Sequence, residues 1–159
     1  MSIGCARRPS TIVLGLAGGA LLALGASAAT AVAASAPSTE LVSLTSTGAQ
    51  VDGDVSSEAS MTPDGRFVVF TSSSPNLAPG AAGGTGAFVY LRDRTLATTE
   101  LVSRAGDGGP PNGNSANGLG PPVISADGRY VAFASQASNL VVGDTNNAVD
   151  IFVRDRLEA

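Results

Sequence analysis

Residues 143–150 carry the side chains best suited to holding a metal ion. Asp144, Asn146 and Asp150 place three oxygen-bearing groups in a short loop before a β-prone segment. Calcium binds carboxylate and amide oxygens in such loops, so these residues are the candidate calcium ligands. The alternative is a polar turn whose Asp and Asn side chains bond to nearby backbone groups. The corresponding stretch at 80–86 has no acidic residue, and no other cofactor is expected.

Side chains for catalysis are scarce. The sequence has no His and no Lys, and its single Cys is Cys5. This excludes a Ser-His-Asp or Cys-His mechanism and any His-ligated metal site. Arg-Asp-Arg occurs at 92–94 and 154–156, where it would either grip a substrate or, as we expect, form pairs at strand ends that discourage edge-to-edge aggregation. The best enzymatic alternative is a glycosidase-like pair of carboxylates, although the acids lie mostly in turns.

An internal repeat supplies the elements that must position these groups. The stretch VISADGRYVAFAS at 123–135 has an earlier copy, SMTPDGRFVVFTS, at 60–72. In both copies Asp-Gly between apolar runs predicts a tight turn followed by a strand. Each strand is apolar on both alternating faces, which predicts that both faces are buried. The turns are offset by 63 residues, so the chain holds two units of about sixty residues.

Each unit is expected to contain four antiparallel strands. In the first unit they are predicted at 58–61, 66–72, 88–92 and 99–103. In the second they are predicted at 122–125, 129–135 and 151–154, with no fourth strand, and a spare strand at 40–44 precedes the first unit. Four antiparallel strands per unit are typical of a β-propeller blade, in which the leading strand would complete another blade.

Residues 1–36 have the pattern of a secretory signal peptide, expected to be helical. Arg7 and Arg8 precede an apolar run, and small-residue sites follow it, so cleavage is expected after Ala28 or Ala33. An uncleaved membrane anchor is the alternative, because the low-charge run exceeds ~18 residues. The arginine pair leaves twin-arginine export open beside the general secretory route. The expected location is secreted, periplasmic or cell-envelope.

The composition of the chain excludes one class of partner. Its 159 residues include 13 acidic and 9 basic side chains, for a formal net charge of −4. An acidic chain without basic clusters is a poor candidate for binding nucleic-acid phosphates. The 20 Gly and 9 Pro residues suit many short strands and turns better than long helices.

The repeated motifs resemble the TolB-like family of bacterial β-propellers, with their WD-like repeats. The motifs are SADGRYVAFAS, SNLVVGDTN and DIFVRDR in the second unit, and TPDGRFVVFTS, PNLAPG and FVYLRDR in the first. The resemblance covers roughly residues 40–156. It implies an all-β fold in which residues 37–159 form two antiparallel four-stranded blades, at about 40–103 and 104–159, of an incomplete propeller.

The resemblance also implies a function. A chain of this kind would be a secreted, non-catalytic scaffold that binds a protein or glycan partner, and the alternative is an accessory or degenerate propeller domain of a secreted hydrolase. Propellers close with about four to eight blades. Two blades therefore predict a fragment of a larger propeller, a homo-oligomer that completes the ring, or an open pair of sheets. Contact with a membrane is expected only through an uncleaved leader.

Overall fold

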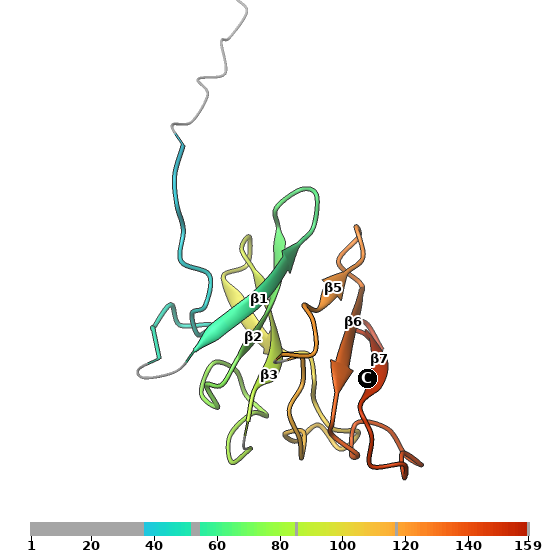
Figure 1. Ribbon diagram of the computed structural model, residues 1–159. Helices are drawn as coiled ribbons and strands as arrows, with labels where there is room; N and C mark the ends of the chain where they lie inside the picture. Colours follow the sequence, from blue (N-terminus) through green and yellow to red (C-terminus); the bar gives the residue numbers. More distant parts are fainter. Residues whose placement is uncertain (1–36, 52–54, 85, 117, 159) are drawn as a thin grey trace, which may run out of the picture. The chain divides into compact units, whose positions relative to one another are not determined.

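The computed structural model describes residues 37–51, 55–84, 86–116 and 118–158. Two compact units divide the chain, Met1–Pro37 and Ser38–Ala159, and all that follows concerns the second. The predicted signal helix and its cleavage sites lie outside the described residues. Those residues form seven β-strands and no helix (Figure 1). Accordingly, this part of the chain offers no helix that could cross a membrane.

The strands form two antiparallel sheets. Sheet A has the order β1 (Ser56–Met61), β2 (Phe67–Ser72), β3 (Phe88–Asp93) and β4 (Thr98–Leu101). Sheet B has the order β5 (Val123–Ile124), β6 (Tyr130–Ser135) and β7 (Asp150–Asp155). In each sheet consecutive strands are neighbours, as in a meander. The two sheets also share a register, because Phe67 pairs with Asp93 at one end of β2 and β3 while Tyr130 pairs with Asp155 at the same end of β6 and β7.

The predicted Asp-Gly turns are present and have one geometry in both units. Gly65 and Gly128 adopt φ angles of +72° and +74°, a conformation that glycine accepts without steric cost. In sheet A the Asp64 carboxylate accepts hydrogen bonds from the Thr62 hydroxyl at 2.6 Å and from the Arg66 N–H at 3.0 Å. Asp127 does the same in sheet B. These aspartates therefore fix the turns, as the sequence predicts.

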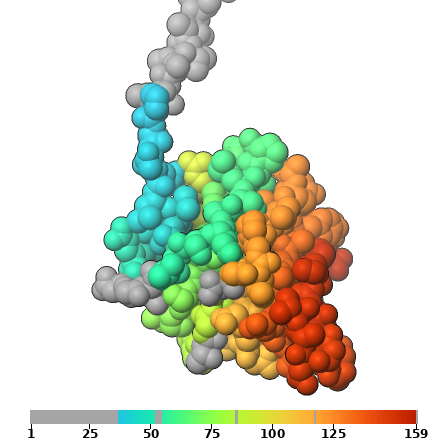
Figure 2. Space-filling view, in the orientation of Figure 1, coloured from blue at the N-terminus to red at the C-terminus, as the bar shows by residue number. Residues whose placement is uncertain are grey.

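A shared apolar core joins the two sheets. Val69, Val89 and Leu91 of sheet A pack in one cluster with Val131 and Phe133 of sheet B. The residues of β1 and β5 adjoin at the surface in Figure 2, and the Ser60 hydroxyl donates to the Pro122 carbonyl at 2.7 Å. The alternating side chains of β2 and β3 thus supply one layer of a buried interface.

A second core covers the opposite face of sheet A. Phe70, Phe88 and Tyr90 pack there with Leu77 and Ala81 from the segment between β2 and β3. The Tyr90 hydroxyl donates to the Ser74 carbonyl at 2.5 Å. Because both faces of β2 and β3 are buried, the prediction from their unbroken apolar pattern is confirmed for the first unit.

For the second unit the same prediction holds only in part, because β6 is buried at Val131, Phe133 and Ala134 but exposed at Tyr130. Tyr130, Ile151 and Val153 lie on the face of sheet B that points away from sheet A, and they are 40, 74 and 67% exposed. Among the described residues no third sheet packs on this face. The strand predicted at 40–44 is also absent. A strand requires a neighbour for its backbone groups, and the described part of the chain offers this segment none.

Candidate functional site

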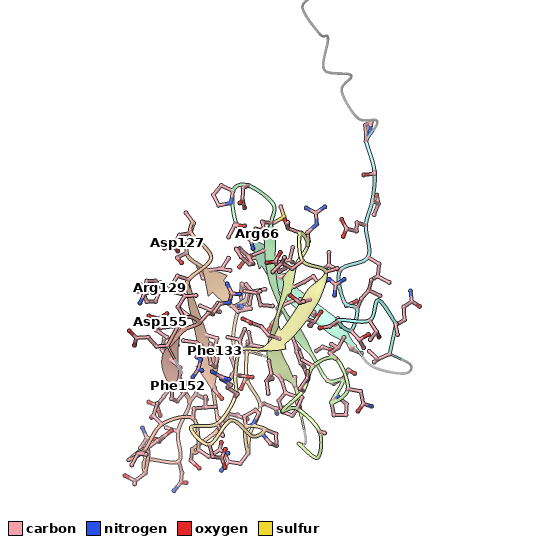
Figure 3. All side chains as sticks on the ribbon, turned by 180° about the vertical axis from the view of Figure 1, so that it is seen from behind. Arg66, Asp127, Arg129, Phe133, Phe152 and Asp155 are labelled. Atoms are coloured by element: carbon pink, nitrogen blue, oxygen red, sulfur yellow. The ribbon has the colours of Figure 1, made fainter. Side chains whose placement is uncertain are left out.

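The Arg-Asp-Arg triplets first act as structural clamps. The Arg66 guanidinium makes a two-pronged contact with Asp93, with Nη2 at 2.7 Å from Oδ2. Arg129 holds Asp155 in the same way at 2.5 Å. The arginine hydrogen bond is the main reason that the pKa of each aspartate lies below its ordinary value. Figure 3 shows Arg129 and Asp155 lying together on sheet B. The triplets thus supply ion pairs at strand ends, while their effect on aggregation stays a prediction.

The last arginine of each triplet reaches beyond its own strand. Arg94 donates to Glu40 Oε2 at 2.5 Å and to the Gly65 carbonyl at 2.6 Å. Arg156 donates to Glu100 Oε1 at 2.5 Å and to the carbonyl of the corresponding turn glycine in sheet B. Sheet B is therefore tied to β4 of sheet A through an ion pair.

Arg156 also crosses the boundary between the sheets in a second way. Its guanidinium carbon lies 4.6 Å from the centre of the Phe67 ring in sheet A. Arg66 lies at 4.5 Å from the same ring. A guanidinium over an aromatic face is an attractive contact, so Phe67 is held by one arginine from each sheet.

A hollow of about 540 Å³ opens between β4 and β7, and we call it the arginine cleft. Its charged lining consists of Glu100, Arg104, Arg154 and Arg156. Within the described part of the chain, the side chains of Arg104 and Arg154 make no hydrogen bond or ion pair, although Glu100 attracts Arg154 from a greater distance. Burial lowers the pKa of Arg154, and repulsion from Arg104 lowers it further. The cleft therefore holds two unpaired cations.

This arrangement suits an acidic ligand group. A guanidinium presents a planar fork of N–H donors that matches a carboxylate or a similar oxyanion. An anion between Arg104 and Arg154 would relieve their mutual repulsion and supply hydrogen-bond acceptors. Glu100 does not fill this role, because its carboxylate is engaged by Arg156.

The candidate calcium ligands lie around a different hollow. Asp144, Asn146 and Asp150 line a space of about 330 Å³. Asn146 Oδ1 accepts a hydrogen bond from the Ala148 N–H at 3.0 Å, as the polar-turn alternative expects. Asp150 Oδ2 is buried and has no hydrogen-bond partner among the described residues, which contain no cluster of three His, Cys, Asp or Glu side chains for a metal. Calcium binding stays an untested hypothesis beside the polar turn.

Sequence reasoning missed Arg104 as a site residue. Glu-Leu-Val-Ser occurs twice and is followed by Leu44 in the first instance but by Arg104 in the second. That departure from the repeat is the signal that could have identified it. Arg154 was singled out, but only as a strand-end residue.

The comparisons with known proteins leave the site to be argued from its geometry alone. No family model, no curated protein and no solved structure matches this chain.

Proposed function

We propose that the chain is a secreted, non-catalytic binding scaffold of the β-propeller type, which holds an acidic group of a protein or glycan partner in the arginine cleft. The observation that carries the proposal is the pair of unpaired guanidinium groups, Arg104 and Arg154, at one hollow between the sheets. Ligand sites are commonly hollows with a few convergent polar groups.

The state of four aspartates, those of the turns and clamps, makes them unsuited to act as the acid of a glycosidase. A glycosidase needs one carboxylic acid with a raised pKa to protonate the leaving group. Asp64, Asp93, Asp127 and Asp155 instead have lowered pKa values, because hydrogen bonds to their charged forms hold them ionised. All four are committed to turns and clamps.

The repeated sheets support the propeller interpretation. Sheets A and B have the same strand order, the same turn and the same clamp, and they pack face to face through one apolar cluster. Radial repetition of such antiparallel sheets is how propellers are built. The TolB-like resemblance is therefore part of the proposal, as is export through residues 1–36.

A binding experiment with a matched pair of variants tests the proposed site. The purified protein is titrated calorimetrically with an acidic polysaccharide, polygalacturonate, and with acidic peptides, beside neutral counterparts of each. We expect saturable binding of an acidic ligand that weakens with added salt. Arg104→Gln should weaken it by about tenfold, since an ionic hydrogen bond contributes about 1.5–3 kcal/mol, whereas Arg104→Lys should retain part of it. If Arg104→Gln and Arg104→Lys both bound the acidic ligand as tightly as the unaltered protein, the assignment of Arg104 to the ligand site would be contradicted.

Two further measurements test the rest of the proposal. A screen with peptide and glycoside substrates separates the scaffold from a hydrolase, because robust turnover would establish the enzymatic alternative. Mass spectrometry of the exported protein should find an N-terminus just after Ala28 or Ala33, and an intact leader would favour the membrane-anchor alternative.

A further inference from the structure

One five-residue sequence, TELVS, occurs twice in the chain but belongs to a strand only once. Residues 98–103 read TTELVS and residues 38–43 read STELVS. The later instance contains β4, with Leu101 only 7% exposed, whereas Leu41 in the earlier instance is 48% exposed and outside any strand. The same residues thus have a sheet partner in one place and none in the other.

Strand β4 makes two kinds of contact at the same time. Its backbone pairs with β3, with Glu100 opposite Leu91 and Leu101 opposite Tyr90. Its Glu100 side chain reaches the next sheet and forms the ion pair with Arg156. β4 therefore completes one sheet and docks against the following one.

Segment 38–43 makes only the second of these contacts. Its Glu40 bonds to Arg94, as Glu100 bonds to Arg156. Arg94 also donates to the turn carbonyl of Gly65, as Arg156 does to that of Gly128. The segment therefore lies against sheet A as β4 lies against sheet B, but it lacks a strand to complete.

Strand β7 has the complementary deficiency. It is the end strand of sheet B among the described residues, whereas the corresponding strand in sheet A, β3, is covered by β4. Ile151 and Val153 on the outward face of β7 are 74 and 67% exposed, whereas their counterparts Val89 and Leu91 are buried by the packing of sheet B on sheet A. An open, apolar strand edge is a template for pairing with another chain.

We propose that segment 38–43 of one copy of this chain adds to β7 of a second copy as its fourth antiparallel strand. The register of β3 and β4 places Leu41 opposite Phe152 and Glu40 opposite Val153 of the other copy. The occupant is a second copy because segment 38–43 is the β4 sequence and already makes the β4 contact with the following sheet. This inference goes beyond the proposed ligand site and does not depend on it.

Two side-chain bonds of sheet A indicate what the docked strand would gain. Arg92 donates to the Thr99 hydroxyl at 3.0 Å, so Arg154 would donate to the Thr39 hydroxyl of the other copy. The Val89 N–H donates to the Ser103 hydroxyl at 2.9 Å, so the Ile151 N–H would donate to Ser43. Arg154 would then be engaged by the docked strand, so that strand and a ligand that needs both Arg104 and Arg154 would compete for the arginine cleft.

Such an interface is head-to-tail, because each copy gives a segment at one side and receives one at the other. Interfaces of this kind close into rings or extend into filaments. They also have a diagnostic property. One variant cannot donate segment 38–43 and the other cannot accept it at β7. A single contact can still form between these two variants, because each retains the half that the other lacks.

Proline variants can block each half of the contact separately. Arg156 N–H donates to the Arg129 carbonyl, so by strand alternation the Val153 N–H faces the open edge of β7 and not β6. Val153→Pro therefore prevents β7 from accepting segment 38–43 of another copy. It leaves the hydrogen bonds between β6 and β7 in place, since proline is tolerated on an edge strand. Val42→Pro blocks giving, because the counterpart N–H, that of Val102, donates to the Val89 carbonyl at 2.8 Å.

The matched control is Val142→Pro. Val142 is 104% exposed and precedes Gly143, whose φ is +91°, a turn position that proline suits. The first unit already has Pro79 followed by Gly80 at the corresponding place. This substitution introduces the same residue type on the same sheet without touching the open edge.

The masses of these proteins, measured by light scattering after purification of the full chain, test the proposal. We expect the unaltered chain and Val142→Pro to assemble, Val153→Pro and Val42→Pro to be monomers with unchanged circular dichroism, and their equimolar mixture to form a one-to-one dimer. A monomeric unaltered chain, assembly of both proline variants, or a mixture that stays monomeric would each overturn it. If Val153→Pro fails to fold, Val42→Pro is mixed with the unaltered chain instead, because residue 42 lies outside every strand. We expect this mixture to form shorter assemblies than the unaltered chain alone. Assemblies of unchanged length would count against the proposal.

Discussion

Sheets A and B are built from related repeated motifs but differ in how much of them is buried. Leu91 on β3 is 1% exposed and its counterpart Val153 on β7 is 67% exposed. Both are apolar strand residues in matching positions. The difference teaches that the apolar pattern specifies a strand that can be covered on both faces, while the neighbouring layer decides whether it is covered.

The same comparison explains the arginine cleft. Arg92 in sheet A bonds to the Thr99 hydroxyl and to the Thr45 carbonyl, and it is 6% exposed. Arg154 occupies the matching position in sheet B, where the described residues supply no fourth strand beside it. An arginine that is structural in one sheet is thus free to bind a ligand or a docking strand in the other.

The largest expected contrast comes from truncating the matched pair of strand residues. Leu91→Ala should lower the free energy of unfolding by about 2–5 kcal/mol, because it leaves a cavity in the shared core. Val153→Ala should change it by less than about 0.5 kcal/mol, because the side chain is exposed in the single copy. Urea unfolding of dilute protein measures both. Similar losses would mean that sheet B is covered in solution even at low concentration.

The turn glycines give the next contrast. Gly65→Ala should lower the free energy of unfolding by about 1–2 kcal/mol, which is the cost of the left-handed backbone alone. Little is added by steric contact, because the new Cβ would come closest to the far end of the Arg94 side chain, at 3.3 Å. Gly128→Ala should cost more, because the Cβ would overlap the Phe67 ring of sheet A. Thermal unfolding measures the order. Adding Phe67→Leu should recover part of the second loss and none of the first.

The clamps predict a pH dependence that differs between the sheets. The pKa of Asp93 is lowered in the folded protein, chiefly by the bond from Arg66. Its stabilisation is therefore present above the unfolded-state pKa of about 3.9 and is lost as the pH falls through the folded-state pKa. Asp93→Asn should cost about 1–3 kcal/mol at neutral pH, and this cost should vanish in acid.

The counterpart substitution should have a smaller effect of the same sign. The Asp155 side chain is 18% exposed against 6% for Asp93. Asp93 accepts bonds from the N–H groups of Thr95 and Leu96, whereas Asp155 accepts one from Leu157. Urea unfolding of Asp155→Asn across the same pH range tests the order, and a larger loss than that of Asp93→Asn would reverse the comparison.

The smallest expected effect concerns the loop at 143–150. Its first-unit counterpart at 80–86 has no acidic residue, so any calcium effect must come from the second unit. Because Asn146 is already engaged in its own turn, we expect no heat on titration with calcium and no shift in Tm. A saturable heat that Asp150→Asn removes would instead establish the calcium site.

Much of the architecture could be predicted from local signals. The Asp-Gly turns and the strands around Phe70 and Phe133 depend on residues close together in sequence, and the two-unit repeat is visible as a recurrence of these local motifs. The strand predicted at 40–44 failed for a physical reason. Its residues match those of β4, but a strand exists only where another backbone accepts its hydrogen bonds.

The candidate site was less accessible to prediction. The exposure of Ile151 and Val153 cannot be read from their types, because Val89 and Leu91 are of the same types and are buried. The arginine cleft depends on Arg104 and Arg154, which are 50 residues apart and meet only through the stacking of the sheets. The pairing of Arg66 with Asp93 likewise required the antiparallel register of β2 and β3.

The contact of Arg94 with Glu40 and of Arg156 with Glu100 has a consequence for how such a chain can grow. In each joint the acidic half, Glu40 or Glu100, precedes a sheet, and the basic half, Arg94 or Arg156, directly follows the third strand of that sheet. A tandem duplication of the gene would therefore insert a new module whose two junctions already fit, with no compensating mutation. Lengthening by whole modules is, for this sequence, an evolutionarily easy step.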